Sequence, residues 1–357
     1  MIPDYPDLEP LCMGDLRALE EAYHTISPRT CDASPVNLHI WRDCQKPMLT
    51  RIHGNVCVLL ESHAEPPYFL EPYGAQELLE TVRTCLEHIG LISRVQARTA
   101  AILPREEFEV GPQRDAFDYI YRVQALAELK GKSFDGKRNH IRRFARNCPD
   151  YEFRPLEAPH LHDAAELFEA WAAARENGRS GTLASGALNH DCQRRALERA
   201  FQDYARLGLI GGALLVGGKM QGVIIASRGA GDTAIVHFSY ANGGLPGIYQ
   251  TLLWEACRRL FLPFTYLNLE EDMGIPGLRK TKLSWHPLRL EEKFRISLRA
   301  LPPPGVDRIE VHTSAGERIL LRPPYVARLP ARRGRHRLEL WTAGRGRLLD
   351  AVSFEVR

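Results

Sequence analysis

One stretch decides the fold of this 357-residue chain: Leu209-Ile-Gly-Gly-Ala-Leu-Leu-Val-Gly-Gly-Lys-Met-Gln-Gly-Val-Ile-Ile-Ala-Ser227. Its two apolar, β-branched runs are typical of strands, and the Gly217-Gly218 pair between them is a strong hairpin signal. A third apolar run, residues 233–240, follows the short connection Arg228-Gly-Ala-Gly-Asp232. The stretch therefore predicts three consecutive antiparallel strands.

The segments around these strands predict helices and one further strand. Helical periodicity covers residues 161–174 and 191–207 before the strands, and residues 248–261 after them. The loop Asn242-Gly-Gly-Leu-Pro-Gly247 leads into the last of these helices, and a strand is expected over residues 264–269. This order resembles that of GNAT-type acyltransferases, in which the loop entering the helix offers free N–H groups to a phosphate.

The predicted last strand ends in a charged segment. Three acids, Glu270, Glu271 and Asp272, precede the corner Gly274-Ile-Pro-Gly277. Three cations follow within four residues, namely Arg279, Lys280 and Lys282. Two interpretations are open at this point. Both signs of charge would serve a site for an anionic ligand with a reacting centre, or the charges pair with one another on a solvated turn.

The first 149 residues predict a separate α/β unit. Strands are expected over residues 49–61, 68–71, 92–97 and 117–121, and a helix over residues 74–89. This part contains no Gly-rich phosphate loop, so it is a poor candidate for the catalytic half.

Residues 130–146 carry seven Lys or Arg against one acid, Asp135. Three of the arginines, Arg138, Arg142 and Arg146, are spaced to stack on one helical face, where like charges repel each other. A phosphate-bearing partner would compensate this repulsion. The alternative is an ordinary solvated helix face.

The composition and the residue pattern change after Pro302-Pro-Pro-Gly305. Residues 302–357 hold eleven Arg and no Lys against six acids, a local balance of +5, whereas the remaining residues carry −2. Apolar and polar residues alternate there with a period of two. A small basic β-module over residues 305–357 is expected, without visible chemistry.

The cysteines and the hydropathy give expectations about metal and compartment. None of the eight cysteines forms a C-x-x-C pair or a His/Cys cluster with zinc spacing, so no metal site is predicted. Scattered thiols suit a reducing compartment. The longest weakly polar run, residues 207–218, is too short for a membrane span, and no signal peptide is visible. A soluble, cytoplasmic protein is expected.

Three segments carry a resemblance to a known family: Phe117-Asp-Tyr-Ile-Tyr121, Leu129-Lys-Gly-Lys-Ser-Phe-Asp-Gly-Lys-Arg-Asn-His-Ile-Arg-Arg-Phe144 and Leu269-Glu-Glu-Asp-Met-Gly-Ile-Pro-Gly-Leu-Arg-Lys-Thr-Lys-Leu-Ser-Trp-His-Pro287. They resemble the phosphatidylglycerol lysyltransferase C-terminal domain family over roughly residues 30–298. The resemblance implies two tandem GNAT-like domains, related to Fem-type and leucyl/phenylalanyl transferases, which take an aminoacyl group from tRNA. We expect an α/β (α+β) chain with domains at residues 1–149 and 150–300, the second of them catalytic, followed by the β-module.

Two features depart from the family. The lysyltransferase proper has an integral-membrane portion and acts on a lipid, whereas no span is predicted here. The family's usual pattern also lacks the basic module after Pro302. Aminoacyl or acyl transfer is therefore the leading chemistry, and the lipid substrate is left open.

The resemblance also suggests roles for individual residues. An aminoacyl ester is already activated, so the enzyme must place an acceptor, stabilise the oxyanion and take one proton. The expected catalytic residues are Glu270, Glu271 and Asp272, with His237 and Tyr240 as further proton-transfer candidates, although a lone strand histidine is more often a core residue. The expected phosphate and substrate contacts are Lys137, Arg138, Asn139, Arg142, Arg279, Lys280 and Lys282, with Asn242, Gly243 and Gly244 at the oxyanion.

No cofactor is implied, because aminoacyl-tRNA would be the donor substrate, with tRNA as the partner. The acceptor is an amine or hydroxyl of a small molecule, a peptide or a lipid headgroup. Two alternatives remain open: an acyl-CoA-dependent N-acyltransferase, disfavoured by Pro246 in the Gly-rich loop, which removes one N–H donor, and a non-catalytic module that binds RNA or another partner.

Overall fold

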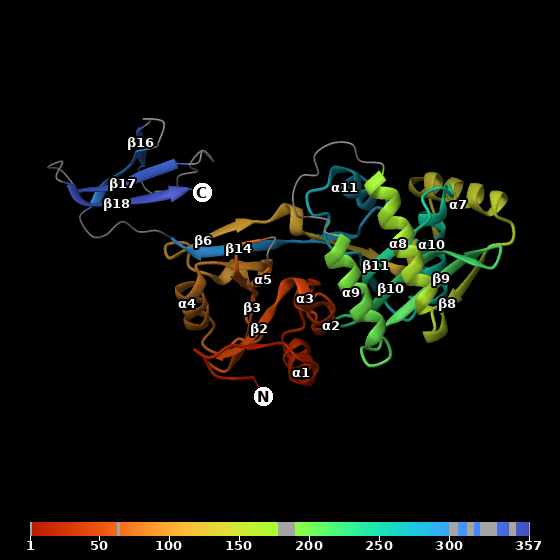
Figure 1. Ribbon diagram of the computed structural model, residues 1–357, viewed down its shortest axis with the longest axis horizontal. Helices are drawn as coiled ribbons and strands as arrows, with labels where there is room; N and C mark the ends of the chain where they lie inside the picture. The colour runs from red at the N-terminus through yellow and green to blue at the C-terminus, as the bar shows by residue number, and fades with distance from the viewer. Residues whose placement is uncertain are drawn as a thin grey trace. The chain divides into compact units, whose positions relative to one another are not determined.

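A computed structural model describes residues 2–62, 65–177 and 190–299, together with the strands of the C-terminal part. The chain divides into two compact units (Figure 1). The first comprises residues 1–103 and 110–297, and the second residues 104–109 and 298–357. No helix among the described residues is long and apolar enough to cross a membrane.

The first unit contains two seven-stranded sheets, of which one is built mainly from the N-terminal half. Its order is β1-β2-β3-β4-β5-β14-β6. Strands β2 to β4 form an antiparallel meander, and helix α4 leads to β5, which pairs in parallel with β4. The bounds are β1 Glu9–Pro10, β2 Pro47–Ile52, β3 Asn55–Leu60, β4 Tyr68–Phe69, α4 Leu78–Ile89, β5 Ile92–Gln96, β6 Phe108–Pro112 and β14 Lys293–Leu298.

The second sheet has the order β13-β7-β12-β11-β10-β9-β8. It contains the predicted meander, because β9, β10 and β11 pair antiparallel in sequence, and α10 then crosses to β12, which is parallel to β11. The bounds are β7 Asp118–Arg122, β8 Glu152–Pro155, β9 Ile210–Val216, β10 Lys219–Arg228, β11 Thr233–Ala241, α10 Ile248–Arg259, β12 Tyr266–Asn268 and β13 Arg289–Glu291. Each sheet thus repeats the same pattern of a meander, a helix and a parallel strand, and the fold is a tandem of two GNAT-like domains.

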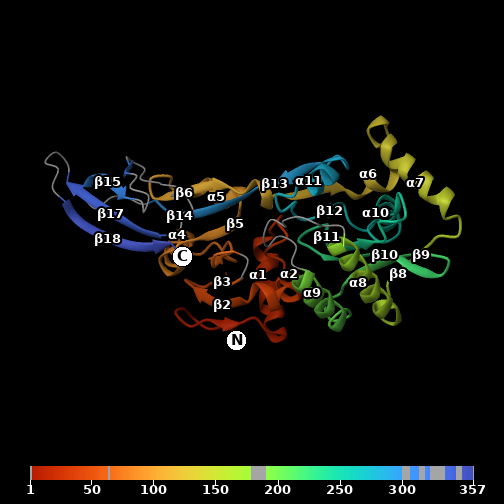
Figure 2. The ribbon, with the colours of Figure 1, turned by 45° about the horizontal axis from the view of Figure 1, so that its top comes forward.

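Helices cover both faces of the second sheet. α6 (Val123–Glu128), α7 (Asp135–Asn147) and α10 pack on one face, around a core that includes Phe144, Ile224 and Val236. α8 (Leu161–Asn177), α9 (His190–Gln202) and α2 (Pro35–Ile40) pack on the other face (Figure 2). Three further helices are α1 Leu16–Ile26, α3 Arg42–Gln45 and α5 Ala97–Ile102.

Strand β11 changes the face that its side chains occupy at His237. Ala226 of β10 pairs with Val236, but the preceding Ile225 pairs with Phe238, so His237 is the extra residue of a β-bulge. Val236 consequently joins the core beneath α10, whereas Phe238 and Tyr240 join the core beneath α8 and α9. Bulges of this kind re-aim side chains, and they are frequent next to active sites.

The expected domain boundary at residues 149/150 does not coincide with the division between the sheets. β7 lies before this boundary, yet it pairs with β12 and β13 of the second sheet. β14 lies after the boundary, yet it pairs with β5 of the first sheet. The two halves exchange strands, because main-chain pairing does not depend on proximity in sequence.

The charged corner is a helix rather than a turn that leads directly to a strand. α11 spans Pro276–Leu283, with proline in its first turn, where the missing N–H removes no helical hydrogen bond. Arg279, Lys280 and Lys282 therefore lie on a helix.

Two cysteines depart from the expectation of single thiols. Cys44 of α3 and Cys192 of α9 form a disulfide with a Cα–Cα distance of 5.8 Å. This bond joins a helix of the N-terminal half to one that covers the second sheet.

The second unit contains a four-stranded antiparallel sheet of order β16-β15-β17-β18, as the period-two pattern predicted. The strands are β15 Val306–His312, β16 Arg318–Leu321, β17 Gly334–Thr342 and β18 Leu348–Val356. The predicted linker at residues 302–305 lies outside the described residues.

Candidate active site at the separation of two strands

The short strand β12 pairs in parallel along its whole length, but only with the first part of β11. The last paired residues are Ile235 and Asn268; beyond them β11 continues to Ala241, whereas β12 ends and the chain after it is no longer paired with β11. Glu270 and Met273 have positive φ angles of 57° and 52°, so the chain after β12 changes direction twice. As a result, the three consecutive acids face three different environments.

Asp272 is fully buried and holds the turn together. Its carboxylate accepts hydrogen bonds from Arg279 at 2.8 and 2.9 Å, from Arg114 at 3.0 Å and from the Tyr119 hydroxyl at 2.5 Å. The Gly274 N–H donates a further bond at 2.9 Å. Burial by itself would raise the pKa of Asp272, but the bonds from Arg279 and Tyr119 outweigh it and lower the pKa to about 2.

These contacts correct the roles expected for Asp272 and Arg279. With its pKa near 2, Asp272 is a poor proton acceptor at neutral pH. The Arg279 guanidinium also pairs with the exposed carboxylate of Asp115 at 2.6 Å, so two carboxylates of the same chain balance its charge. The pair stabilises the turn instead of facing a ligand.

Glu271 belongs to a buried ionic cluster built from both halves of the chain. The Lys293 ammonium lies 2.7 Å from Asp118 and 3.5 Å from Glu271, and it also contacts Asp32. Arg94 lies 3.4 Å from Asp32. Burial raises the pKa of Glu271, while Arg94 and Lys293 act in the opposite direction.

Three residues near this cluster, Cys31, Asp32 and Asp118, are of types that can bind a metal ion, and their potential ligand atoms lie close together. The Lys293 ammonium contacts both carboxylates, and its Nζ lies 3.7 Å from the Cys31 sulfur. The Lys293 ammonium therefore already neutralises the two carboxylates that a metal cation would otherwise bind. Burial also raises the pKa of the Cys31 thiol, which disfavours the thiolate that metals bind.

Glu270 faces the bulge of β11. Its Oε1 lies 3.0 Å from His237 Nδ1, and His237 Nε2 lies 2.8 Å from the Ser227 hydroxyl of β10. The Glu270 side chain is 21% exposed, whereas the His237 side chain is fully buried. No Lys or Arg side chain among the described residues lies within ion-pair distance of Glu270. It is thus the one acid of the three without such a partner.

Tyr240 lies in the core beneath α8 and α9, away from the acids. It packs in a ring cluster with Phe168 and Trp171, and its hydroxyl donates to Gln193 at 3.1 Å. The bulge at His237 accounts for this direction. The expected proton-transfer role of Tyr240 therefore has no support from its position.

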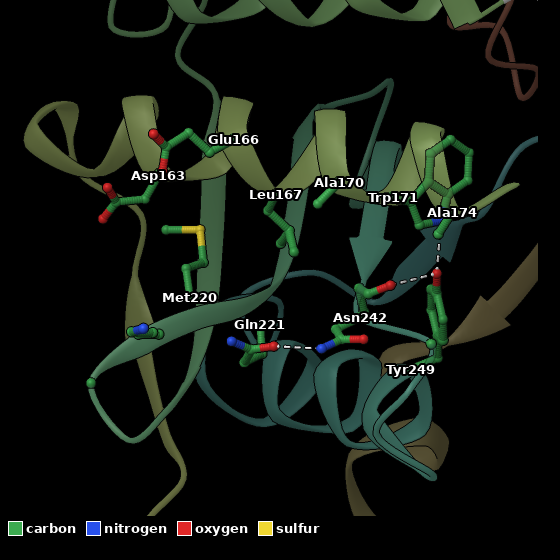
Figure 3. A pocket seen from close by; sticks show the side chains of 14 residues that line it. Asp163, Glu166, Leu167, Ala170, Trp171, Ala174, Met220, Gln221, Asn242 and Tyr249 are labelled. Carbon is green, nitrogen blue, oxygen red and sulfur yellow. Dashed lines mark hydrogen bonds between the residues drawn. The ribbon is translucent and has the colours of Figure 1, made fainter. Parts of the chain in front are cut away.

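The Gly-rich loop lines a pocket of about 760 Å³ (Figure 3). One wall is α8, with Leu167 and Trp171, and the opposite wall includes Gln221, Asn242 and Tyr249. The remaining lining residues are Asp163, Glu166, Ala170, Ala174, Gly218, Lys219, Met220, Ala241 and Gly243.

Part of the hydrogen-bonding capacity of this loop is used internally. The Gly244 N–H donates to the Asn242 side chain at 2.9 Å, and the Asn242 amide donates to Gln221 at 2.8 Å. The Gly244 N–H is therefore not free to bind an oxyanion, contrary to its expected role. The roles of Asn242 and Gly243 stay predictions.

The predicted cations separate into internal and exposed groups. Lys137 is buried, donates to Ser284 at 2.6 Å and lies 4.4 Å from the Trp285 ring centre, and burial lowers its pKa to about 8. Lys282 donates to the backbone oxygens of Leu269 and Glu271. Both lysines stabilise the fold around α11, contrary to a role as phosphate contacts.

The other predicted contacts lie at the surface, with one exception. Arg138 donates hydrogen bonds to the carbonyl oxygens of Leu129 and Gly131 and to the Asp135 carboxylate. It therefore links the first turn of α7 to the segment that precedes this helix. Asn139, Arg142 and Lys280 are exposed and stay predictions as phosphate contacts; their exposed neighbours Arg143 and Arg146 extend the basic face of α7.

Several residues at the site were not predicted: Asp32, Arg94, Asp118, Ser227 and Lys293. Asp118 lies within a segment that carried the resemblance, which was the only signal for it. Nothing in the spacing of the other four connects them with residues 270–272. Lys293 comes to the cluster on the exchanged strand β14, and Ser227 lies on β10, beside β11.

Comparison with known proteins agrees with this architecture. Residues 23–297 match the family model described as phosphatidylglycerol lysyltransferase, C-terminal. A conserved protein of unknown function from Bacteroides thetaiotaomicron VPI-5482 is 30% identical, covers 84% of this chain and 100% of its own, and superposes with a TM-score of 0.73. L-PGS from Bacillus licheniformis shares the fold at 13% identity, with 85% and 96% covered and a TM-score of 0.55.

No match was found among curated proteins. The family model nevertheless extends from α1 to β14 and so includes both sheets and the acids at the end of β12. The chain belongs to the phosphatidylglycerol lysyltransferase C-terminal domain family.

Proposed function

We propose that this protein is a transferase that moves an aminoacyl group from aminoacyl-tRNA to an amine or hydroxyl acceptor. The observation that supports this most directly is the state of Glu270. Glu271 and Asp272 each lie within ion-pair distance of a cation, whereas Glu270 has no Lys or Arg partner among the described residues. The Glu270 carboxylate is also partly exposed, at 21%, as is that of Glu271 at 23%. A carboxylate in this position suits proton transfer or the binding of an amine.

The proposed step needs one base and no covalent nucleophile. The acceptor nitrogen or oxygen attacks the carbonyl carbon of the aminoacyl ester, and Glu270 takes the proton that the acceptor loses. The bond between the carbonyl carbon and the ribose oxygen then breaks, and the proton passes to that oxygen as the tRNA leaves. Glu270 is thereby restored to its ionised form.

The donor is proposed to lie along α7. Arg142 and Arg146 have no partner among the residues that the structure describes, and both are exposed on one face of this helix. Exposed cations at this spacing can neutralise successive phosphates of a nucleic acid backbone. Lys280 on α11 is a further exposed candidate.

The acyl-CoA alternative relies on the Gly-rich loop as a pyrophosphate site. In that loop the Gly244 N–H is already bonded and Pro246 has none, which leaves few donors for a diphosphate. The pocket beside the loop could nevertheless accept a different ligand. The non-catalytic alternative predicts RNA binding without turnover.

The test uses purified protein and total tRNA charged with radiolabelled amino acids. Filter retention is measured at low and physiological salt, and loss of label from tRNA is followed with and without a cell extract of metabolites and lipids as a source of acceptors. The proposal predicts salt-sensitive retention and loss of label faster than spontaneous hydrolysis. Absence of both would reject it, and acyl transfer from acyl-CoA in a parallel assay would establish the alternative.

A further inference from the structure

Ser227 of β10, His237 of β11 and Glu270, two residues after the end of β12, form a continuous hydrogen-bonded row. Ser227 Oγ lies 2.8 Å from His237 Nε2, and His237 Nδ1 lies 3.0 Å from Glu270 Oε1. These are the residue types and the order of a serine hydrolase triad, in which serine is the nucleophile and the acid orients the histidine. The row could therefore be used from either end.

Exposure decides which end is used. Ser227 is 1% exposed and lies on β10, in the middle of the sheet. The Glu270 side chain is 21% exposed, at the point where the strands have separated. A substrate can approach the carboxylate but not the hydroxyl, so the order of access is the reverse of that in a hydrolase.

The hydrogen bonds also determine which nitrogen of His237 carries a proton. An ionised carboxylate only accepts hydrogen bonds, so Nδ1 must donate to Glu270. Nε2 of a neutral imidazole is then an acceptor, and the hydroxyl of Ser227 is its donor. Without that hydroxyl, the buried Nε2 would have no partner among the described side chains.

We propose that Ser227 is a positioning residue: it holds His237 with the proton on Nδ1, and His237 in turn fixes the Glu270 carboxylate for proton transfer. The bulge at His237 makes this arrangement possible, because the extra residue directs the imidazole between β10 and the end of β12. The tautomer follows from the row itself, whereas the catalytic consequence rests on the proposed transferase function.

The first test needs no substrate. Nitrogen-15 NMR of the imidazole at pH 8 distinguishes the two neutral tautomers, and the His237→Gln spectrum identifies the signals of His237. We expect the Nδ1–H form in the wild type and also in Ser227→Ala, because the Glu270 carboxylate still accepts from Nδ1. The Nε2 signal should move in Ser227→Ala, because this nitrogen loses its hydrogen-bond donor, and Ser239→Ala, at an exposed serine on β11, should give the wild-type spectrum. An Nε2 signal that stays at its wild-type position in Ser227→Ala would overturn the proposal even if the transferase is active.

The second test measures transfer. Ser227→Ala should lower kcat about tenfold with KM unchanged, the order expected for loss of one hydrogen bond that orients a base. Ser227→Thr, which keeps a hydroxyl, should restore most of kcat. Complete loss in Ser227→Ala, together with an acyl adduct on Ser227 in intact-mass spectrometry of the wild type, would show that serine is the nucleophile and would overturn the assignment.

The two tests separate the possible failures. A moved Nε2 signal in the Ser227→Ala variant of a protein without transferase activity would contradict the proposed function and leave the row intact. Thermal unfolding of each variant shows whether a loss of activity reflects unfolding. Where Ser227→Ala itself unfolds, the proposal is decided by the tautomer of wild-type His237: an Nε2–H form would overturn it.

Discussion

Lys293 is expected to contribute strongly to stability, because it is the cation of a buried cluster. Its ammonium lies 2.7 Å from Asp118 and 3.5 Å from Glu271 and contacts Asp32, and both Lys293 and Asp118 are fully buried. Burial alone would lower the pKa of Lys293, yet Asp118 and Asp32 hold it well above its ordinary value. Lys293→Met would keep the length of the side chain and remove the charge.

The expected loss follows from what remains at Asp118. Its carboxylate would keep hydrogen bonds from the Cys31 N–H at 2.7 Å and from Asn268 at 2.9 Å, but it would lose its cation. Removing one partner of a buried ion pair costs about 3–5 kcal/mol. Asp118→Asn in the Lys293→Met background should recover part of this loss, since it removes the uncompensated charge.

The pH dependence of the loss has a definite sign. Burial raises the pKa of Glu271 and Lys293 opposes this, so in Lys293→Met the pKa of Glu271 lies further above its unfolded value and the folded state binds more protons. The deficit relative to wild type should therefore shrink as the pH falls from 7 towards 4. Equilibrium urea unfolding at both pH values measures it, with Lys219→Met as the exposed control.

Two results would refute this reasoning. A deficit below about 1 kcal/mol, which is the size of an average substitution, would show that Lys293 does not balance a buried charge. A large deficit that stays constant between pH 7 and 4 would show that lost packing, rather than charge, accounts for it.

Three further predictions concern the turn, the disulfide and the basic helix. Asp272→Asn should cost about 2 kcal/mol at pH 7, because a pKa lowered from 3.8 to about 2 stabilises the fold above the unfolded value; in urea unfolding the difference should diminish as the pH falls from 4 towards 2. Replacing Cys44 and Cys192 by alanine should cost about 2–4 kcal/mol, and a reductant should lower the wild-type Tm but not that of the variant. Arg142→Gln and Arg146→Gln should each weaken RNA binding in all sequences tested and reduce the slope of log affinity against log salt by about one; an unchanged slope would exclude phosphate contact.

Much of the second domain could be predicted from local pattern. The Gly217-Gly218 pair fixed the hairpin, and the helical periodicity after the Gly-rich loop located α10. The strand at residues 117–121 was also predicted, but its partners β12 and β13 were not, because they lie more than 140 residues further along the chain. Local signals do not encode such pairing, and this is why the expected boundary at residues 149/150 does not coincide with the division between the two sheets.

The site was predicted in location but not in its division of roles. The run of three acids marked the end of β12, yet the positive φ of Glu270 and Met273, which turns the acids apart, has no signature in non-glycine residues. The burial of Lys137, in contrast, did have a signature in the sequence. It stands four and seven residues before Ile141 and Phe144, the spacing of one helical face, but the charge of the surrounding segment concealed this signal.

The central claim is that Glu270 is the base of an aminoacyl transfer, and one comparison tests it most directly. The rate of label transfer from charged tRNA is measured for the wild type, for Glu270→Gln and for Glu198→Gln, an exposed acid on α9 that serves as control. We predict that Glu270→Gln lowers kcat on the order of 10²–10⁴-fold, the range of general base catalysis, while tRNA binding and the Tm stay unchanged and Glu198→Gln transfers at the wild-type rate. Wild-type transfer by Glu270→Gln would contradict the account.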